Sequence, residues 1–160
     1  MLNVHPAPLP EFGGQEMYGM ELGANVPRAA AYASRAMGEK RDETPFASLL
    51  GERLSSAEFV LNDYVQLRFD GPTLNAYSHP VVTVAGRTFR WGETGYRDAL
   101  CERILAVVRA AWAAPEEIVI QLGDDSTLAV SNRVEDVMGA EAAELSTPNG
   151  LWVWRPGEWP

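Results

Sequence analysis

The chain has 160 residues, of which 46% are hydrophobic and 22% are charged, and its formal net charge is -9. This size and composition are typical of one globular domain that buries a core without disulfides or metals. The negative charge argues against nucleic-acid binding, because phosphate backbones are bound by clustered Lys and Arg. No apolar run reaches the roughly 18 residues that span a bilayer, and no secretion signal is recognisable. We therefore expect a cytoplasmic protein without a membrane partner.

Residues 1–45 are expected to form an arm that carries one short helix. Proline and glycine recur in its first half and interrupt any regular pattern. A helix is predicted over residues 25–38, since Asn25 can cap it and Pro27 suits its first turn. The remaining residues, 46–160, are expected to form a single α+β domain.

The first part of this domain is predicted to be a short helix, from Pro45 to about Leu54, followed by strands. Apolar residues alternate in YVQLRFD and again in LNAYSH, and the Gly71-Pro72 turn between them predicts a hairpin. A second hairpin is predicted in VVTVAGRTFRW, around Ala85-Gly86. We expect these four strands to form a meander.

One long helix is predicted from about Gly95 to Ala113, with Thr94 as its cap and Pro115 after its end. Apolar residues recur at helical spacing along it. They are Tyr96, Leu100, Ile104, Val107, Val108 and Ala111. Cys101 is the single cysteine, so an intrachain disulfide is excluded, which suits a reducing cytoplasm. We predict that its thiol is buried on this helix, because free cysteines are among the most buried side chains.

The stretch EEIVIQLGDDSTLAVS predicts two strands, Glu117–Leu122 and Thr127–Ser131, joined by a Gly-Asp-Asp turn. One or two helical turns are predicted between Asn132 and Leu145, with MGAEAAEL as their main candidate, and LWVW predicts a closing strand. The expected fold is therefore α+β. It consists of one antiparallel sheet of about six or seven strands packed on the long helix, with the arm and its short helices outside.

The sequence offers no recognisable catalytic machinery. It has only two histidines, no clustered metal ligands, and no glycine-rich phosphate loop. Asp124 and Asp125 are adjacent in a predicted turn, but the spacing around them does not match a calcium loop. We expect no catalytic residues, no metal site and no cofactor.

Tryptophan is concentrated near the end of the sequence. In a strand, residues two apart face the same way, so Trp152 and Trp154 share one side of LWVW, and Leu151 and Val153 share the other. We predict that Leu151 and Val153 pack on the long helix, while the two indoles are covered by the arm or by another chain. Trp159 follows in a proline-flanked tail and is expected either to dock separately or to be disordered.

These aromatic residues are the candidate binding residues. The set is Trp152, Trp154, Trp159, Trp91, Tyr77, His79 and Arg155. Arg155 is included because a guanidinium can stack on indole rings. If the hairpin ends and the closing strand are neighbours, Tyr77, His79, Trp91, Trp152 and Trp154 would line one aromatic pocket.

From Tyr64 to Trp154 the pattern resembles uncharacterised small bacterial α+β proteins. The shared features are a hairpin, a helix, a hairpin with an Asp-containing turn, a Gly-x-Glu-Ala-Ala stretch and a final Trp-rich strand. The Gly-x-Glu-Ala-Ala stretch here is Gly139, Glu141, Ala142 and Ala143. The acidic composition is also similar to that of toxin-immunity proteins. The resemblance implies no catalytic residues.

We therefore expect a non-enzymatic acidic interaction protein, with an immunity or antitoxin-like inhibitor of a basic protein as one concrete form. Two alternatives remain. One is a small-molecule-binding or hydrolytic domain that uses the aromatic pocket. The other is a homodimeric structural protein, in which the partner is a second copy that covers the tryptophans.

Overall fold

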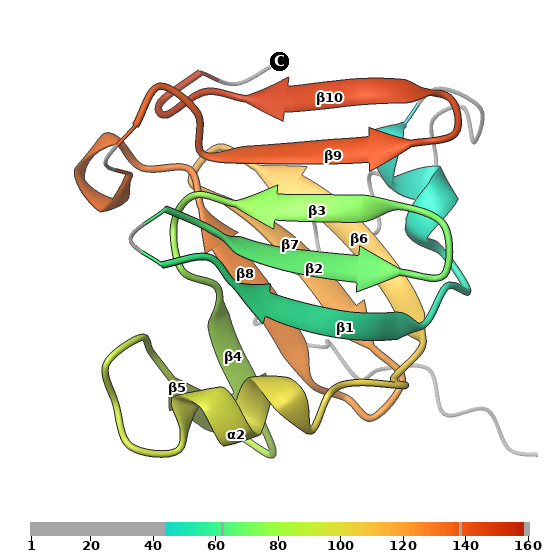
Figure 1. The fold of residues 1–160 in the computed structure, drawn as a ribbon, viewed down its shortest axis with the longest axis vertical. Coiled ribbons are helices and arrows are strands. Elements are labelled where there is room, and N and C mark those ends of the chain that lie inside the picture. The colour runs from blue at the N-terminus through green and yellow to red at the C-terminus, as the bar shows by residue number, and fades with distance from the viewer. Residues whose placement is uncertain (1–43, 62, 138, 159–160) are drawn as a thin grey trace, which may run out of the picture.

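The computed structural model describes residues 44–61, 63–137 and 139–158, and these form two antiparallel sheets of five strands each. The predicted arm helix over residues 25–38 and the candidate Trp159 lie outside the described residues. In Figure 1 the first sheet faces the viewer and the second lies behind it, with its strands running obliquely to those in front. The described chain is therefore a two-layer β structure.

The first sheet has the order β1-β2-β3-β9-β10. Its strands are β1 (Leu54–Phe59), β2 (Val65–Phe69), β3 (Thr73–Ala76), β9 (Ala143–Thr147) and β10 (Gly150–Trp154). The second sheet has the order β5-β4-β8-β7-β6. Its strands are β4 (Val81–Val84), β5 (Arg87–Phe89), β6 (Val108–Ala114), β7 (Glu117–Leu122) and β8 (Thr127–Ser131). Every pairing between these strands is antiparallel.

The hydrophobic core lies between the two sheets. Alternate residues of β2 and β3 point inward, so that Leu67 and Leu74 are fully buried opposite each other. From the second sheet, Ile120 and Leu128 are paired and equally buried. Each such side chain contributes about 2 kcal/mol by leaving water, which makes this shared core the main source of stability.

Short helical segments close two sides of the sandwich. The 3-10 helix η1 (Pro45–Leu49) packs against β6 and β9, and α2 (Tyr96–Cys101) packs against β1 and β4. A bridge between Arg53 and Val107 joins the start of β1 to the start of β6, which links the sheets along one side. The edge strands of the two described sheets are β1, β10, β5 and β6, and this bridge engages only the starts of β1 and β6. A further 3-10 turn, η2 (Val134–Asp136), lies between β8 and β9.

The predicted α+β architecture is wrong, because the structure is mainly β and contains no long helix within the described residues. The helix expected from Gly95 to Ala113 ends at Cys101. Leu105 has a left-handed φ of 77°, and its N–H bonds to Leu54 O in β1 instead of continuing the helix. The alanine-rich segment that follows is strand β6, paired with β7. None of the helices in the described part of the chain is long and apolar enough to cross a membrane.

Two further expectations about this region are wrong. Cys101 is exposed rather than buried. The buried residues of the short α2 are Tyr96, Ala99 and Leu100, so Cys101 lies on its outer side. The helical turns predicted between Asn132 and Leu145 are found only as the 3-10 turn η2 among the described residues. The favoured stretch MGAEAAEL leads instead into strand β9 (Ala143–Thr147), hydrogen-bonded between β3 and β10.

The three predicted hairpins are confirmed as β2–β3, β4–β5 and β7–β8, and the bounds of β7 and β8 match the prediction. The meander is wrong, because the first hairpin belongs to one sheet and the second to the other. The short helix predicted from Pro45 to about Leu54 ends earlier, at Leu49, and strand β1 begins at Leu54. Local turn signals therefore located the hairpins but not their sheets.

Candidate functional site

Strand β10 is an edge strand with an unusually apolar exposed surface. It pairs with β9 on one side, and no described strand pairs with its other side. Leu151, Trp152 and Val153 are 61%, 42% and 38% exposed. Edge strands are commonly protected from other strands by charge, proline or shortness. Edge strand β5 has only three residues and begins with Arg87, whereas β10 has five residues and neither charge nor proline.

The orientation of the β10 backbone follows from two hydrogen bonds. Gly150 O accepts from Thr147 Oγ1 at 3.2 Å, and Trp154 O accepts from Ala142 N at 2.8 Å, so both carbonyls point toward β9. In an extended strand the backbone groups of successive residues point to opposite sides. The N–H and C=O groups of Leu151 and Val153 therefore point to the free edge.

The side chains of β10 also alternate. Trp154 points inward, is only 6% exposed and stacks on Phe46 of η1, with ring centroids 5.3 Å apart. Trp152 has the same orientation but lies farther along the edge and remains partly exposed. The prediction that Leu151 and Val153 pack on the long helix is wrong, because both are exposed and no long helix is present in the described residues. The indole of Trp154 is covered by Phe46, and the arm expected to cover Trp152 lies outside the described residues. Helix α2 lies at the opposite end of the first sheet from β10 (Figure 1).

Next to this edge, Glu144 occupies the outward position of β9 that pairs with Val153. Its Oε2 accepts hydrogen bonds from Tyr77 OH at 2.8 Å and from Asn75 Nδ2 at 3.4 Å. Partial burial, the hydrogen bond to Glu144 and nearby negative charge raise the pKa of Tyr77 far above its ordinary value. Tyr77 is therefore a neutral donor that holds the Glu144 carboxylate in place.

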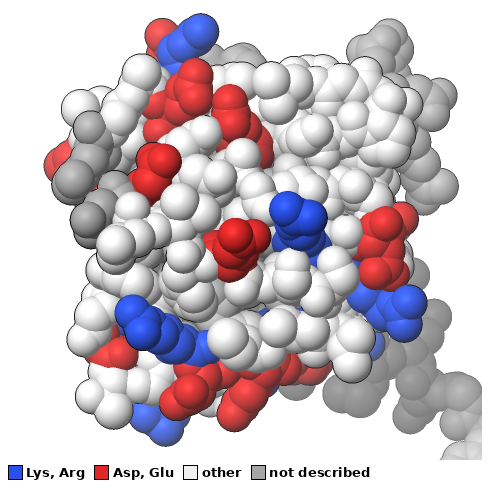
Figure 2. Space-filling model, viewed as in Figure 1, with Lys and Arg blue, Asp and Glu red and all other residues white. Residues whose placement is uncertain are grey.

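Two further carboxylates, Asp63 and Glu141, lie close enough to contribute to the same rise of the Tyr77 pKa. We refer to Asp63, Glu141 and Glu144 as the acidic cluster. Figure 2 shows acidic side chains gathered where β10 ends and β9 begins, beside a continuous uncharged area over the rest of these two strands. The free edge of β10 therefore combines apolar and acidic surface.

A polar ladder continues from Glu144 across the outer face of the first sheet. Gln66 Nε2 donates to Asn75 Oδ1 at 2.9 Å, and Arg68 Nε donates to Gln66 Oε1 at 2.7 Å. These bonds hold Asn75, which in turn contacts Glu144. The position of Glu144 is thus fixed from two directions, by Tyr77 and by the ladder.

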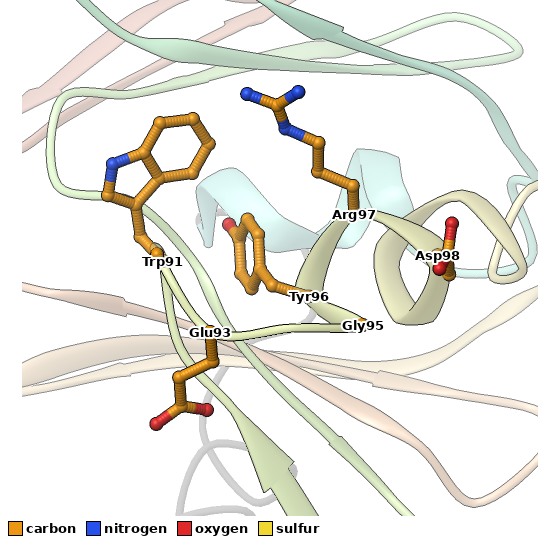
Figure 3. Close-up of a pocket in the computed structure, with 7 residues that line it drawn as sticks. Trp91, Glu93, Gly95, Tyr96, Arg97 and Asp98 are labelled. Carbon is orange, nitrogen blue, oxygen red and sulfur yellow. The ribbon is translucent and has the colours of Figure 1, made fainter.

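A second aromatic group lies near α2, at the other end of the first sheet. The Trp91 ring stacks on His79 with centroids 4.0 Å apart and is perpendicular to Tyr96 at 5.6 Å. The Arg97 guanidinium carbon lies 5.4 Å from the Trp91 ring centre, a cation–π geometry. Figure 3 shows Arg97 and Trp91 on the same side of the loop, with Glu93 pointing away.

Trp91, Tyr96 and Arg97 line a pocket of about 440 Å³, whose walls also include Gly92, Glu93, Gly95 and Asp98. Tyr96 is 1% exposed, and its hydroxyl has no hydrogen-bond partner. Burial raises the pKa of Tyr96, and burial lowers the pKa of His79. Both side chains are therefore uncharged at neutral pH and suited to the aromatic stack.

The structure does not bring the candidate residues into one pocket. Trp91 and His79 belong to the α2 group, Tyr77 belongs to the acidic cluster, and Trp152 and Trp154 lie on β10. The Arg155 guanidinium pairs with Glu158, Nη1 to Oε2 at 3.7 Å, rather than with a described indole.

Several residues of these groups were not expected from the sequence. The sequence pattern identified the aromatic residues but not Arg97, Glu144 or Glu141. No local pattern indicates that an arginine or a glutamate lies beside a ring that is distant in the sequence. Among the described residues, no group of three or more His, Cys, Asp and Glu side chains could hold a metal ion.

Comparison with protein-family models, with curated proteins and with solved structures found no match for this chain. The geometry of the β10 edge and of the α2 pocket therefore carries the functional argument.

Proposed function

We propose that the protein is a non-enzymatic, cytoplasmic interaction protein that binds a basic protein partner through the free edge of β10. The observation that carries this proposal is the position of the exposed Leu151, Trp152 and Val153 directly beside the acidic cluster. Exposed apolar side chains supply affinity when a partner covers them. The single, exposed Cys101 suits a reducing compartment.

Charge supports a basic rather than an acidic partner. The chain carries a net charge of -9, and the carboxylates of the acidic cluster flank the apolar edge. Complementary charge mainly accelerates encounter and excludes wrong partners, while the apolar contacts hold the complex. An inhibitor that covers a basic toxin would have these properties, and it is one concrete form of the proposed function.

Capture of partners by the immobilised full-length protein tests the proposal. Proteins retained from a bacterial lysate at low salt are identified by mass spectrometry and compared between the wild type and Glu141→Gln/Glu144→Gln. The control Glu117→Gln/Asp125→Asn removes two exposed charges, one from β7 and one from the β7–β8 turn.

We expect the wild type and the control to retain a set of basic proteins that Glu141→Gln/Glu144→Gln does not retain. High salt should reduce the retention of this set by the wild type. No retained set, or a set that is indifferent to the acidic-cluster variant, would contradict the proposed function.

The α2 pocket supports a second candidate function, the binding of a small molecule. Its volume of about 440 Å³ is within the range of ligand sites, and Arg97 and Trp91 offer a cation beside an aromatic surface. A metabolite screen monitored by tryptophan fluorescence tests it. We expect a hit to lose its signal in Trp91→Phe but not in Trp152→Phe, and a hit insensitive to Trp91→Phe would exclude this pocket.

A further inference from the structure

We infer that the partner binds to β10 as an added β-strand whose outward side chains are basic. The inference rests on the proposed function and specifies its binding mode. In strand addition, the backbone of an extended segment bonds to a sheet edge, and alternate side chains give specificity. The free edge of β10 meets the backbone requirement, and the acidic cluster determines which side chains fit.

The backbone requirement is met by Leu151 and Val153. The carbonyls of Gly150 and Trp154 point toward β9. Because successive residues of a strand alternate, the N–H and C=O groups of Leu151 and Val153 point outward. These four groups can form a short ladder with an extended segment. Because neither residue is proline and the strand carries no charge, β10 itself lacks these two features that protect an edge.

The side-chain requirement follows from the strand register. An added strand would lie about 4.8 Å from β10 and roughly twice that distance from β9. Its outward residues would flank Leu151 and Val153, and Glu144 of β9 is the direct neighbour of Val153. A long basic side chain opposite Val153 can cross this one residue and reach the Glu144 carboxylate. Its inward residues would cover the exposed part of Trp152.

A second copy of the chain fits this surface less well. In an antiparallel pairing of two β10 strands centred on Trp152, Val153 of one copy would be opposite Leu151 of the other. Arg155 would then be opposite Asn149, at the far end of the strand from Glu144. The second copy therefore brings no cation to the acidic cluster, whereas an alternating basic strand does.

The probe for the test is a fluorescein-labelled, eight-residue peptide that alternates Arg and Val. The matched control peptide alternates Glu and Val. Binding to the full-length protein is measured by fluorescence anisotropy. We expect the basic peptide to bind, the acidic peptide to bind at least about tenfold more weakly, and affinity for the basic peptide to fall with salt.

Two substitutions at Val153 separate the backbone from the side chain. Val153→Pro removes an outward N–H without removing a bond to β9, and it is expected to weaken peptide binding about tenfold or more. Val153→Thr keeps the N–H and the strand preference and is expected to bind like the wild type.

Glu144→Gln is expected to weaken peptide binding about two- to fivefold, and Asp125→Asn, which changes charge in the β7–β8 turn, is expected to have no effect.

Wild-type affinity in Val153→Pro would overturn strand addition. If the acidic-cluster variants still released basic proteins in the capture experiment, the proposed function would stand with another binding mode. Equal binding of the two peptides would overturn the basic chemistry of the added strand. A wild-type dimer that Val153→Pro dissociates, measured by sedimentation of the full-length proteins, would assign the edge to a second copy and also overturn the inference.

Discussion

The ion pair between Arg103 and Asp124 allows a quantitative test of the fold where the expected long helix is absent. Arg103 follows α2, and its side chain is only 10% exposed. Its Nη1 lies 2.8 Å from Asp124 Oδ2 in the β7–β8 turn, and its Nη2 lies 3.3 Å from Oε2 of the exposed Glu102. Nε has no partner. Asp124 is therefore the main partner of a buried charge.

Asp124→Ala should destabilise the protein by about 3 kcal/mol. Breaking a buried ion pair from one side costs about 3–5 kcal/mol, and the cost falls toward the lower end because Asp124 is 39% exposed. The change also removes the hydrogen bonds that Asp124 accepts from Ser126 N and Oγ. Arg103→Met should cost about 1 kcal/mol or less, since Asp124 keeps those bonds and can be hydrated.

Urea unfolding at pH 7 measures both effects. With a slope of roughly 2 kcal/mol per molar, the midpoint should fall by about 1.5 M for Asp124→Ala and about 0.5 M for Arg103→Met. The double variant should lose less than the sum of the single variants. Equal small losses, or strict additivity, would refute the argument, because they would mean that Arg103 and Asp124 do not interact.

The same pair predicts a pH dependence. Desolvation tends to raise the pKa of Asp124, but the bonds from Ser126 and the charge of Arg103 outweigh it and lower the pKa overall. A lowered pKa stabilises the folded protein above the unfolded value near 4, and this contribution is lost as the pH falls through the lower, folded value. The difference between the wild type and Asp124→Ala should therefore shrink below about pH 4.

Three further predictions concern single side chains. Trp154→Ala should lower the free energy of unfolding in urea by about 3–5 kcal/mol, because the indole is buried against Phe46. Trp152→Ala should lower it clearly less, and equal losses would contradict the orientation of β10. Tyr96→Phe should raise the free energy of unfolding by about 1 kcal/mol, since it removes a buried hydroxyl without a partner, and destabilisation would show that the hydroxyl is bonded. The raised pKa of Tyr96 predicts that the wild type loses stability above pH 10, and Tyr96→Phe should reduce this loss. Cys101 should react stoichiometrically with Ellman's reagent in the folded protein, and reaction only after unfolding would contradict its exposure.

The sequence carried the local part of this fold. Turns such as Gly71-Pro72 and Ala85-Gly86, flanked by alternating apolar residues, identified the hairpins correctly. It did not reveal that the chain passes from one sheet to the other between β3 and β4, because sheet membership depends on pairing with β9 and β8, which are distant in sequence. Long-range pairing has no local signal.

The two errors of secondary structure have a common origin. Alanine predominates in β6 and recurs in MGAEAAEL, the stretch that leads into β9, and alanine favours helix. In β6, pairing with β7 overrides this preference, and in β9 the strand is flanked on both sides by β3 and β10. In β9 the buried Ala143 and Leu145 nevertheless alternate with Glu144 and Ser146, a period that fits a strand.

The candidate site was anticipated only in part. Trp152 and Trp154 were both identified as binding candidates, but the sequence pattern did not distinguish the buried Trp154 from the partly exposed Trp152. The role of Glu144 depends on its register beside Val153 and on hydrogen bonds from Tyr77 and Asn75, which come from residues more than sixty positions away in the sequence. Such a contact emerges from the fold and not from the pattern of residues around Glu144.

Amide hydrogen exchange along β10, resolved by NMR on the full-length protein, tests the central claim most directly. The outward N–H groups of Leu151 and Val153 should exchange fast, and those of Trp152 and Trp154 slowly. Adding the Arg-Val peptide should protect Leu151 and Val153 selectively. Uniform protection of all four amides before any peptide is added, or fast exchange at Leu151 and Val153 that the bound peptide leaves unchanged, would contradict the account.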